Sequence, residues 1–218
     1  VQHLRNAPAF AHLRADQLAV IEHELRDFQL SGVALEEPAR TRFREISREL
    51  AQLETAFEQA IMDATDAYVR PLTEAELTGI PESGRGILAS AAADHDLEGH
   101  ALTLQFPVYN AVITYADDRA LRQALYRANG VRASESGPAE LDNSGLIGRI
   151  LALRAEQASL LGFAGYAEYS LATKMAQSAD QVLEFLRDLA GRALPFARRD
   201  RAELEDFARD ALGLDELQ

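Results

Sequence analysis

Apolar residues recur at steps of three and four along much of the chain, and this spacing predicts amphipathic helices. The longest such stripe lies on a predicted helix from Pro38 to about Tyr68. Its members are Phe43, Ile46, Leu50, Leu53, Phe57, Ile61, Ala64 and Tyr68. A helix of about 30 residues is roughly 45 Å long. A stripe of that length needs partner helices to cover it.

Capping and helix-breaking signals divide the rest of the chain. Thr73–Glu76 and Ser178–Gln181 each have the spacing of a capping box, which predicts a helix start at both places. Pro71 is expected to close the long helix, and Pro195 to kink or divide the last one. Gly213 is expected to stop that last helix.

One short strand interrupts the helical pattern. The segment 101–106 alternates inward and outward side chains, whereas glycines and prolines between 79 and 86 predict turns. Helix is expected to resume from about Asp118, and Asn143 or Ser144 can cap a further helix. The sequence therefore predicts a nearly all-α fold, a bundle of long helices with at most one or two short strands near 101–106.

The chain shows no internal repeat, low-complexity tract or clean linker. We therefore expect residues 1–218 to form a single helical unit, with possible sub-lobes at 1–70 and 72–218. Because the sequence begins with Val1 and ends with Gln218 just after a helix stop, we expect it to be part of a longer protein.

Charge and cysteine content narrow the classes of partner. The 218 residues include 22 Lys and Arg against 35 Asp and Glu, a net charge of −13. Phosphate backbones and anionic membrane surfaces attract clustered cations, so this balance argues against nucleic acid and membrane partners. The absence of Cys excludes disulfides and thiolate metal ligands, and it fits a reducing, cytoplasmic location.

The segment His23–Asp27 resembles a zinc-binding motif in which two His lie one helical turn apart and the Glu between them activates water. Here Asp27 stands where the second His would be. On a helical wheel, His23, Glu24 and Asp27 lie opposite the apolar side, and we interpret them as a solvated polar face. A second group, His95, Asp96, Glu98 and His100, lies on a loop before the strand. We interpret it as a polar turn.

Other candidate chemistry has simpler explanations. No nucleophile elbow and no phosphate-binding glycine loop occurs. Arg198, Arg199 and Arg201 alternate with acidic residues, which predicts pairs on a helix surface. The pairs Glu36–Glu37 and Asp117–Asp118 are expected at helix starts, where the helix dipole favours negative charge. None of these patterns by itself indicates a catalytic, cofactor-binding or metal-binding residue in this chain.

The segment 150–190 is similar to a stretch of the thimet-oligopeptidase-like zinc metallopeptidases. It contains a helix that ends in Leu-Leu-Gly-Phe, then an aromatic turn, and then Met-Ala before the next helix cap. Segments 26–53 and 57–68, together with the Gly79–Pro81 turn and segment 102–135, agree with the same family in the same order. Ala111, where the family often has Pro, is a departure.

The resemblance implies that this chain forms part of the helical wall of a channel that admits short peptides. Members of the family hydrolyse peptides with zinc held by H-E-x-x-H and a further Glu, and all of these lie beyond the part resembled here. The catalytic zinc domain, a partner of this chain, is therefore expected downstream of residue 218. The alternative is a stand-alone, non-catalytic helical scaffold or interaction module.

The junction at 160–176 is the most specific part of this resemblance. Gly162 can adopt the left-handed conformation that ends a helix. Phe163, Tyr166 and Tyr169 are expected to fill the corner that follows. We interpret the segment as a helix–helix junction without chemistry of its own.

Overall fold

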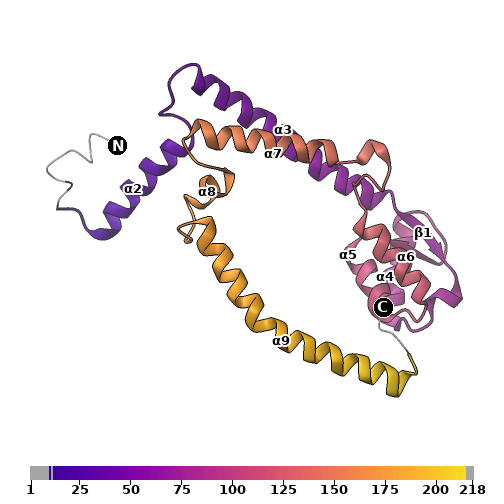
Figure 1. Ribbon diagram of the computed structural model, residues 1–218. Helices are drawn as coiled ribbons and strands as arrows, with labels where there is room; N and C mark the ends of the chain where they lie inside the picture. Colours follow the sequence, from indigo (N-terminus) through magenta and orange to yellow (C-terminus); the bar gives the residue numbers. More distant parts are fainter. Residues whose placement is uncertain (1–9, 11, 215–218) are drawn as a thin grey trace. The chain divides into compact units, whose positions relative to one another are not determined.

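The computed structural model describes residue 10 and residues 12–214, and helices dominate it (Figure 1). The predicted nearly all-α fold is confirmed, since the described residues contain only one two-stranded sheet. The chain divides into two compact units, of which one is Glu36–Gln157. The other combines the described residues up to Leu35 with those from Ala158 onward. The sub-lobes at 1–70 and 72–218 stay a prediction.

The unit Glu36–Gln157 is built on the long helix α3 (Ala39–Asp66), which confirms the predicted helix to within two residues at each end. Helix α7 (Ser144–Leu160) runs alongside it (Figure 1). Ile46 of α3 and Leu153 of α7 are fully buried, and Leu50 is only 7% exposed. The predicted apolar stripe thus has the helical partner that it requires.

The remaining elements of this unit, apart from the last 3-10 helix, contribute to its main core or pack against it. They are β1 (Val69–Leu72), the 3-10 helix η2 (Glu74–Leu77), α4 (Glu82–Asp94), β2 (His100–Thr103), α5 (Phe106–Tyr115), α6 (Arg119–Gly130) and the 3-10 helix η3 (Ala139–Leu141). The two strands pair antiparallel, with Val69 opposite Thr103 and Leu72 opposite His100. The core cluster consists of Leu77, Ile80, Leu88, Ala91, Leu102, Leu104, Val108, Val112, Ala116, Leu121 and Leu125.

The segment after α3 differs from expectation. Helix α3 ends at Asp66, and Pro71 lies within strand β1 instead of closing the helix. Proline lacks the N–H that a strand flanked on both sides needs, but β1 has a single neighbour and Pro71 is exposed. The predicted capping box at Thr73–Glu76 is confirmed, and it opens η2.

Helices α4 and α5 also differ from expectation. Gly84 and Gly86 lie inside α4, where turns were predicted, because Leu88 and its neighbours bury the helix against the core. That burial outweighs a cost of about 1 kcal/mol for each helical glycine. Helix resumes at Phe106, well before Asp118, with a proline in the first turn of α5. The alternating pattern of 101–106 continues up to the start of α5, so the change from strand spacing to helix spacing could not be located from the sequence.

A close contact of backbones joins η2 to the end of α5. The N–H of Asp117 donates to the carbonyl of Thr78 at 2.9 Å. Gly79 has a positive φ of 86°, and a Cβ there would lie 2.4 Å from the carbonyl oxygen of Tyr115. Only glycine fits both the conformation and the space at this position.

The other unit contains α2 (Ala15–Leu30), α8 (Tyr166–Leu171) and α9 (Ala179–Leu212). Its junction agrees with expectation: Gly162 has φ 83°, and the Phe163 N–H returns to the carbonyl of Ala158 at 3.0 Å. The ring centroid of Tyr169 lies 5.5 Å from that of Phe163 and 5.7 Å from that of Tyr166. The predicted aromatic corner is confirmed.

Helix α9 begins and ends as predicted but is not divided. The Ser178 hydroxyl accepts the N–H of Gln181 at 3.1 Å, and Gly213 ends the helix in the left-handed conformation. Pro195 lies inside the helix, which Figure 1 shows as continuous and curved. Proline removes one backbone hydrogen bond and bends a helix, and here the chain remains helical on both sides.

Within the part of the chain that the structure describes, no helix combines the length and hydrophobicity needed to cross a membrane.

Candidate functional site

The seam between α3 and α7 has one edge made of ion pairs. Arg42 donates to both carboxylate oxygens of Glu156 at 2.7 and 2.8 Å. Arg149 contacts both oxygens of Glu49 at 2.5 and 2.8 Å. Bonding to Arg149 lowers the pKa of Glu49, and bonding to Arg42 lowers the pKa of Glu156. The four charged side chains on this edge therefore form two ion pairs that bridge α3 and α7.

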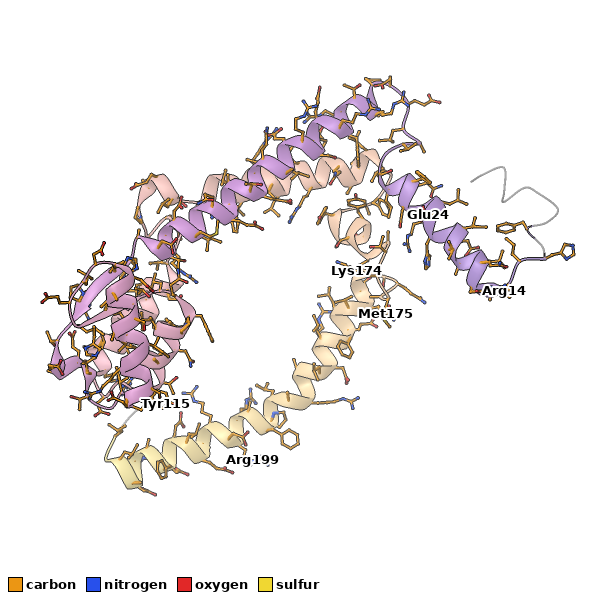
Figure 2. All side chains as sticks on the ribbon, turned by 180° about the vertical axis from the view of Figure 1, so that it is seen from behind. Arg14, Glu24, Tyr115, Lys174, Met175 and Arg199 are labelled. Carbon is orange, nitrogen blue, oxygen red and sulfur yellow. The ribbon has the colours of Figure 1, made fainter. Side chains whose placement is uncertain are left out.

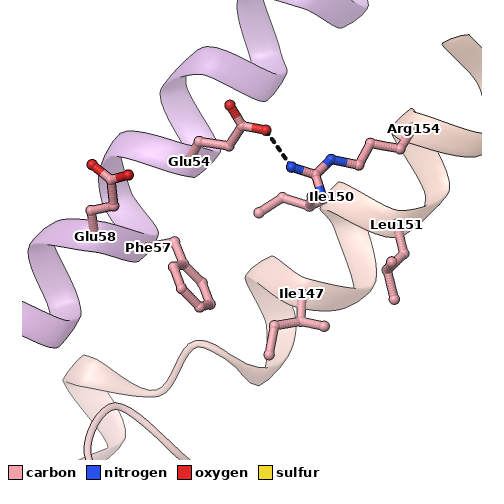
Figure 3. A pocket seen from close by; sticks show the side chains of 7 residues that line it. All are labelled: Glu54, Phe57, Glu58, Ile147, Ile150, Leu151 and Arg154. Atoms are coloured by element: carbon pink, nitrogen blue, oxygen red, sulfur yellow. Dashed lines mark hydrogen bonds and ion pairs between the residues drawn. The ribbon is translucent and has the colours of Figure 1, made fainter. Parts of the chain in front are cut away.

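The opposite edge of the same seam is open and largely apolar. A hollow of about 480 Å³ lies there, between α3 and α7 (Figure 3). Glu54 and Arg154 form an ion pair across it at 2.8 Å. On α7, Ile147 is 46% exposed and Leu151 is 60% exposed. The residues that line the hollow are Glu54, Phe57, Glu58, Ile147, Ile150, Leu151 and Arg154.

The lining of this hollow suits the binding of an apolar side chain. Its apolar floor can hold an aliphatic or aromatic side chain, with carboxylates of α3 at the rim. Ile147 and Leu151 are four residues apart, directly beside the buried positions of α7. This spacing predicts that the apolar side of α7 is wider than its buried positions, but it does not locate the hollow.

The residues of the zinc-like segment lie on α2. His23, Glu24 and Asp27 are all exposed, which confirms the predicted polar face; Figure 2 labels Glu24 on this helix. Phe28 on the same helix is 47% exposed.

The second histidine group is spread over three structural contexts. His95 follows the last turn of α4 and is exposed, Asp96 has a left-handed φ of 55°, and His100 begins β2. Among the described residues, no group of three or more His, Asp or Glu side chains is placed to hold a metal ion. A zinc site needs three or four such ligands around one point. The residues of this chain that the structure describes therefore do not fit the zinc ion that the resemblance implies.

The predicted surface pairs are confirmed for Arg199 and Arg201, and the predicted helix-start position is confirmed for Asp118. Arg199 contacts Asp200 at 2.9 Å, and Arg201 contacts Glu205 at 2.7 Å. The Asp118 carboxylate accepts the N–H of Leu121 at 3.1 Å and caps α6.

The start of α7 is held by two neighbouring side chains. The Asp142 carboxylate accepts the N–H of Ser144 at 2.9 Å. Asn143 is buried, and its side-chain amide donates to the carbonyl of Phe57 on α3 at 3.1 Å. Asn143 therefore links the two helices of the seam in addition to preceding α7.

The chain is similar in sequence to known peptidases. Residues 112–218 match the model of peptidase family M3. Over 218 residues the chain is 44% identical to oligopeptidase A of Escherichia coli, a match that covers 99% of this chain and 32% of that protein. Oligopeptidase A of Haemophilus influenzae is 43% identical (98% and 32%), and the probable cytosolic oligopeptidase A of Arabidopsis thaliana is 37% identical (95% and 30%).

The chain belongs to peptidase family M3. Within that family, its sequence is similar to the bacterial oligopeptidase A proteins. The chain spans about a third of the length of these relatives.

Proposed function

We propose that this chain is the non-catalytic helical part of a metallo-oligopeptidase that hydrolyses short peptides. The observation that carries the proposal is the 44% identity to E. coli oligopeptidase A over 99% of the chain. An alignment of that extent follows the whole order of helices and does not depend on one motif.

In this proposal the chain forms part of the wall of the substrate channel and positions peptides for a reaction that other residues carry out. Long helices such as α3 and α9 suit a wall, because each spans a large distance with few connecting loops. The zinc ion that the resemblance implies would be held by residues outside this chain, since the described residues here do not provide its ligands.

We place the parent protein in the cytoplasm. The absence of Cys fits a reducing compartment, and one relative carries the name probable cytosolic oligopeptidase A.

The test uses the protein translated from the complete reading frame that contains this chain. We expect that protein to cleave a short internally quenched peptide and to leave an unfolded protein substrate intact. We also expect a chelator to abolish cleavage and added zinc to restore it. Cleavage of both substrates at similar rates would contradict the channel.

The alternative is a stand-alone helical scaffold without peptidase chemistry. It predicts a reading frame that stops without an H-E-x-x-H motif and a product that cleaves neither substrate. Either result would reject the peptidase proposal, and the sequence of the reading frame is the quicker of the two to obtain.

A further inference from the structure

Helix α9 carries a long apolar face that is exposed along its length. Six large side chains at helical spacing are each at least half exposed: Phe185 65%, Leu186 50%, Leu189 52%, Phe196 60%, Leu204 60% and Phe207 60%. On a helix of 3.6 residues per turn they fall on one side. The stripe runs through most of the 34 residues of α9.

The rest of the surface of α9 carries many charged side chains. Arg192 pairs with Asp188 at 2.9 Å beside the apolar stripe, and Arg209 pairs with Asp206 at 3.0 Å farther round the helix, all with highly exposed side chains. Leu194 and Leu212 are also exposed, at 48% and 59%, but they lie away from the stripe. The stripe is therefore the longest apolar face of this helix.

Charged residues interrupt the apolar stripe in the second half of α9. Asp200 lies in line with the stripe, and Arg199 donates to it at 2.9 Å. The Arg199 guanidinium also lies 5.5 Å from the ring centroid of Phe196. Figure 2 labels Arg199 near the middle of the helix. Because Arg199 balances the charge of Asp200 on α9 itself, a partner helix that packs there meets a neutral ion pair, whose desolvation its apolar contacts have to offset.

Two kinds of partner could cover such a face: a second copy of this chain, or further polypeptide of the same protein. Two copies would each bring a net charge of −13, and like charges oppose association. The relatives, by contrast, have about two thirds of their length outside the matched part. A stripe at steps of three and four fits the ridges of another helix.

We propose that the apolar face of α9 is the interface for a helix from the part of the parent protein that the matched relatives have and this chain lacks. The inference rests on the proposed function only in taking the parent to be as long as those relatives. It adds a named contact surface, which the assignment to a peptidase family does not specify.

The test exploits the absence of Cys from this chain. Leu189→Cys places a thiol on the apolar face, and the matched control Arg187→Cys places one two residues away on the charged face. Cys is small and apolar enough for a packed site. Each variant is made in the complete parent protein, and maleimide labelling of the peptide containing residue 187 or 189 is followed by mass spectrometry.

In the parent protein we expect position 189 to label at least about tenfold more slowly than position 187, because a packed thiol reacts only when the contact opens. In the 218-residue chain alone we expect the two positions to label at similar rates. Phe207→Cys and Arg209→Cys form a second pair, for use should Leu189→Cys fail to fold.

Equal labelling of both faces in the parent protein would overturn the proposal. So would protection in the 218-residue chain that grows with protein concentration, since that result identifies a second copy as the partner. The same parent preparations are assayed for peptide cleavage. Protection at position 189 without cleavage would reject the proposed function and leave this interface standing, whereas cleavage without protection would do the reverse.

Discussion

At Gly79 two backbone segments meet in a space that holds only a hydrogen atom. The left-handed φ of this residue and the nearby carbonyl of Tyr115 both exclude a side chain. Gly86, on α4, is the opposite case, because a Cβ there meets nothing within 4 Å and the backbone is helical. Two glycines seven residues apart therefore have different physical roles.

We predict that Gly79→Ala lowers the free energy of unfolding by more than about 2 kcal/mol, through backbone strain and a clash. Gly86→Ala should raise it by about 0.5–1 kcal/mol, because alanine loses less conformational freedom in a helix. Urea denaturation of the two variants measures both effects. Changes of the same sign in both variants would contradict the explanation.

The burial of Leu50 in the seam between α3 and α7 contributes to the free energy of unfolding. Its side chain is 7% exposed on the face of α3 that α7 covers. Leu50→Asp should lower the free energy of unfolding by about 3 kcal/mol or more, since it removes apolar burial and leaves a charge without a partner. Gln52→Asp, on the exposed face of the same helix, is the matched control. A Leu50→Asp variant with an unchanged urea midpoint would show that the seam contributes nothing.

At the scale of elements, the α3–α7 pair combines an apolar seam with ion pairs along one edge and an open hollow along the other. The pair Arg42–Glu156 has a small desolvation cost, because the two side chains stay 37% and 42% exposed. Exposed pairs stabilise weakly and are screened by salt. The edge pairs therefore add to a contact that the apolar seam holds.

The pair Arg42–Glu156 predicts a pH dependence. The pKa of Glu156 is lowered in the folded state, so its contribution is present above the unfolded value near 4.5 and is lost as the pH falls through the lower folded value. Glu156→Gln should lower the urea midpoint slightly at pH 7 and make progressively less difference below pH 4.5. Glu58→Gln, at a residue of α3 outside the ion pairs described above, is the control. A difference that grows on acidification would contradict this sign.

Some elements could be predicted from local patterns, and others depended on packing. The helix around Leu50 and the cap at Ser178 were predictable because periodicity and capping act within a few residues. Strand β1 was not, since Pro71 is acceptable there only because β1 is an edge strand. Helix α4 was not either, because its burial, which outweighs Gly84 and Gly86, comes from residues far along the chain.

The candidate site was harder to predict than the fold. The exposed positions of His23 and Asp27 followed from the helical wheel. The hollow beside Ile147 and Leu151 needs the position of α3 relative to α7, and periodicity does not give that position. The sequence of one chain does not identify the polypeptide that covers the apolar face of α9. The labelling experiment on the parent protein identifies it.

At the scale of the whole molecule, we predict that the purified 218-residue chain binds less than one equivalent of zinc and does not cleave a fluorogenic peptide. The described residues offer no set of three ligands around one point. Metal content after dialysis and a peptide cleavage assay measure the two properties. One tightly bound equivalent would indicate that His23–Asp27 or His95–His100 binds zinc. The variants His23→Ala and His100→Ala would then identify which of the two groups holds the ion.

The interleaving of the two units has a consequence for synthesis on the ribosome. The unit Glu36–Gln157 is continuous in sequence, so all its parts have emerged once Gln157 has left the exit tunnel. The other unit needs α2, made before the inserted unit, and α9, made after it. Because domains fold as units during translation, α2 lacks the rest of its unit until the whole inserted unit has been synthesised. A pause in translation after residue 157 should therefore leave the inserted unit protease-resistant and α2 open to cleavage.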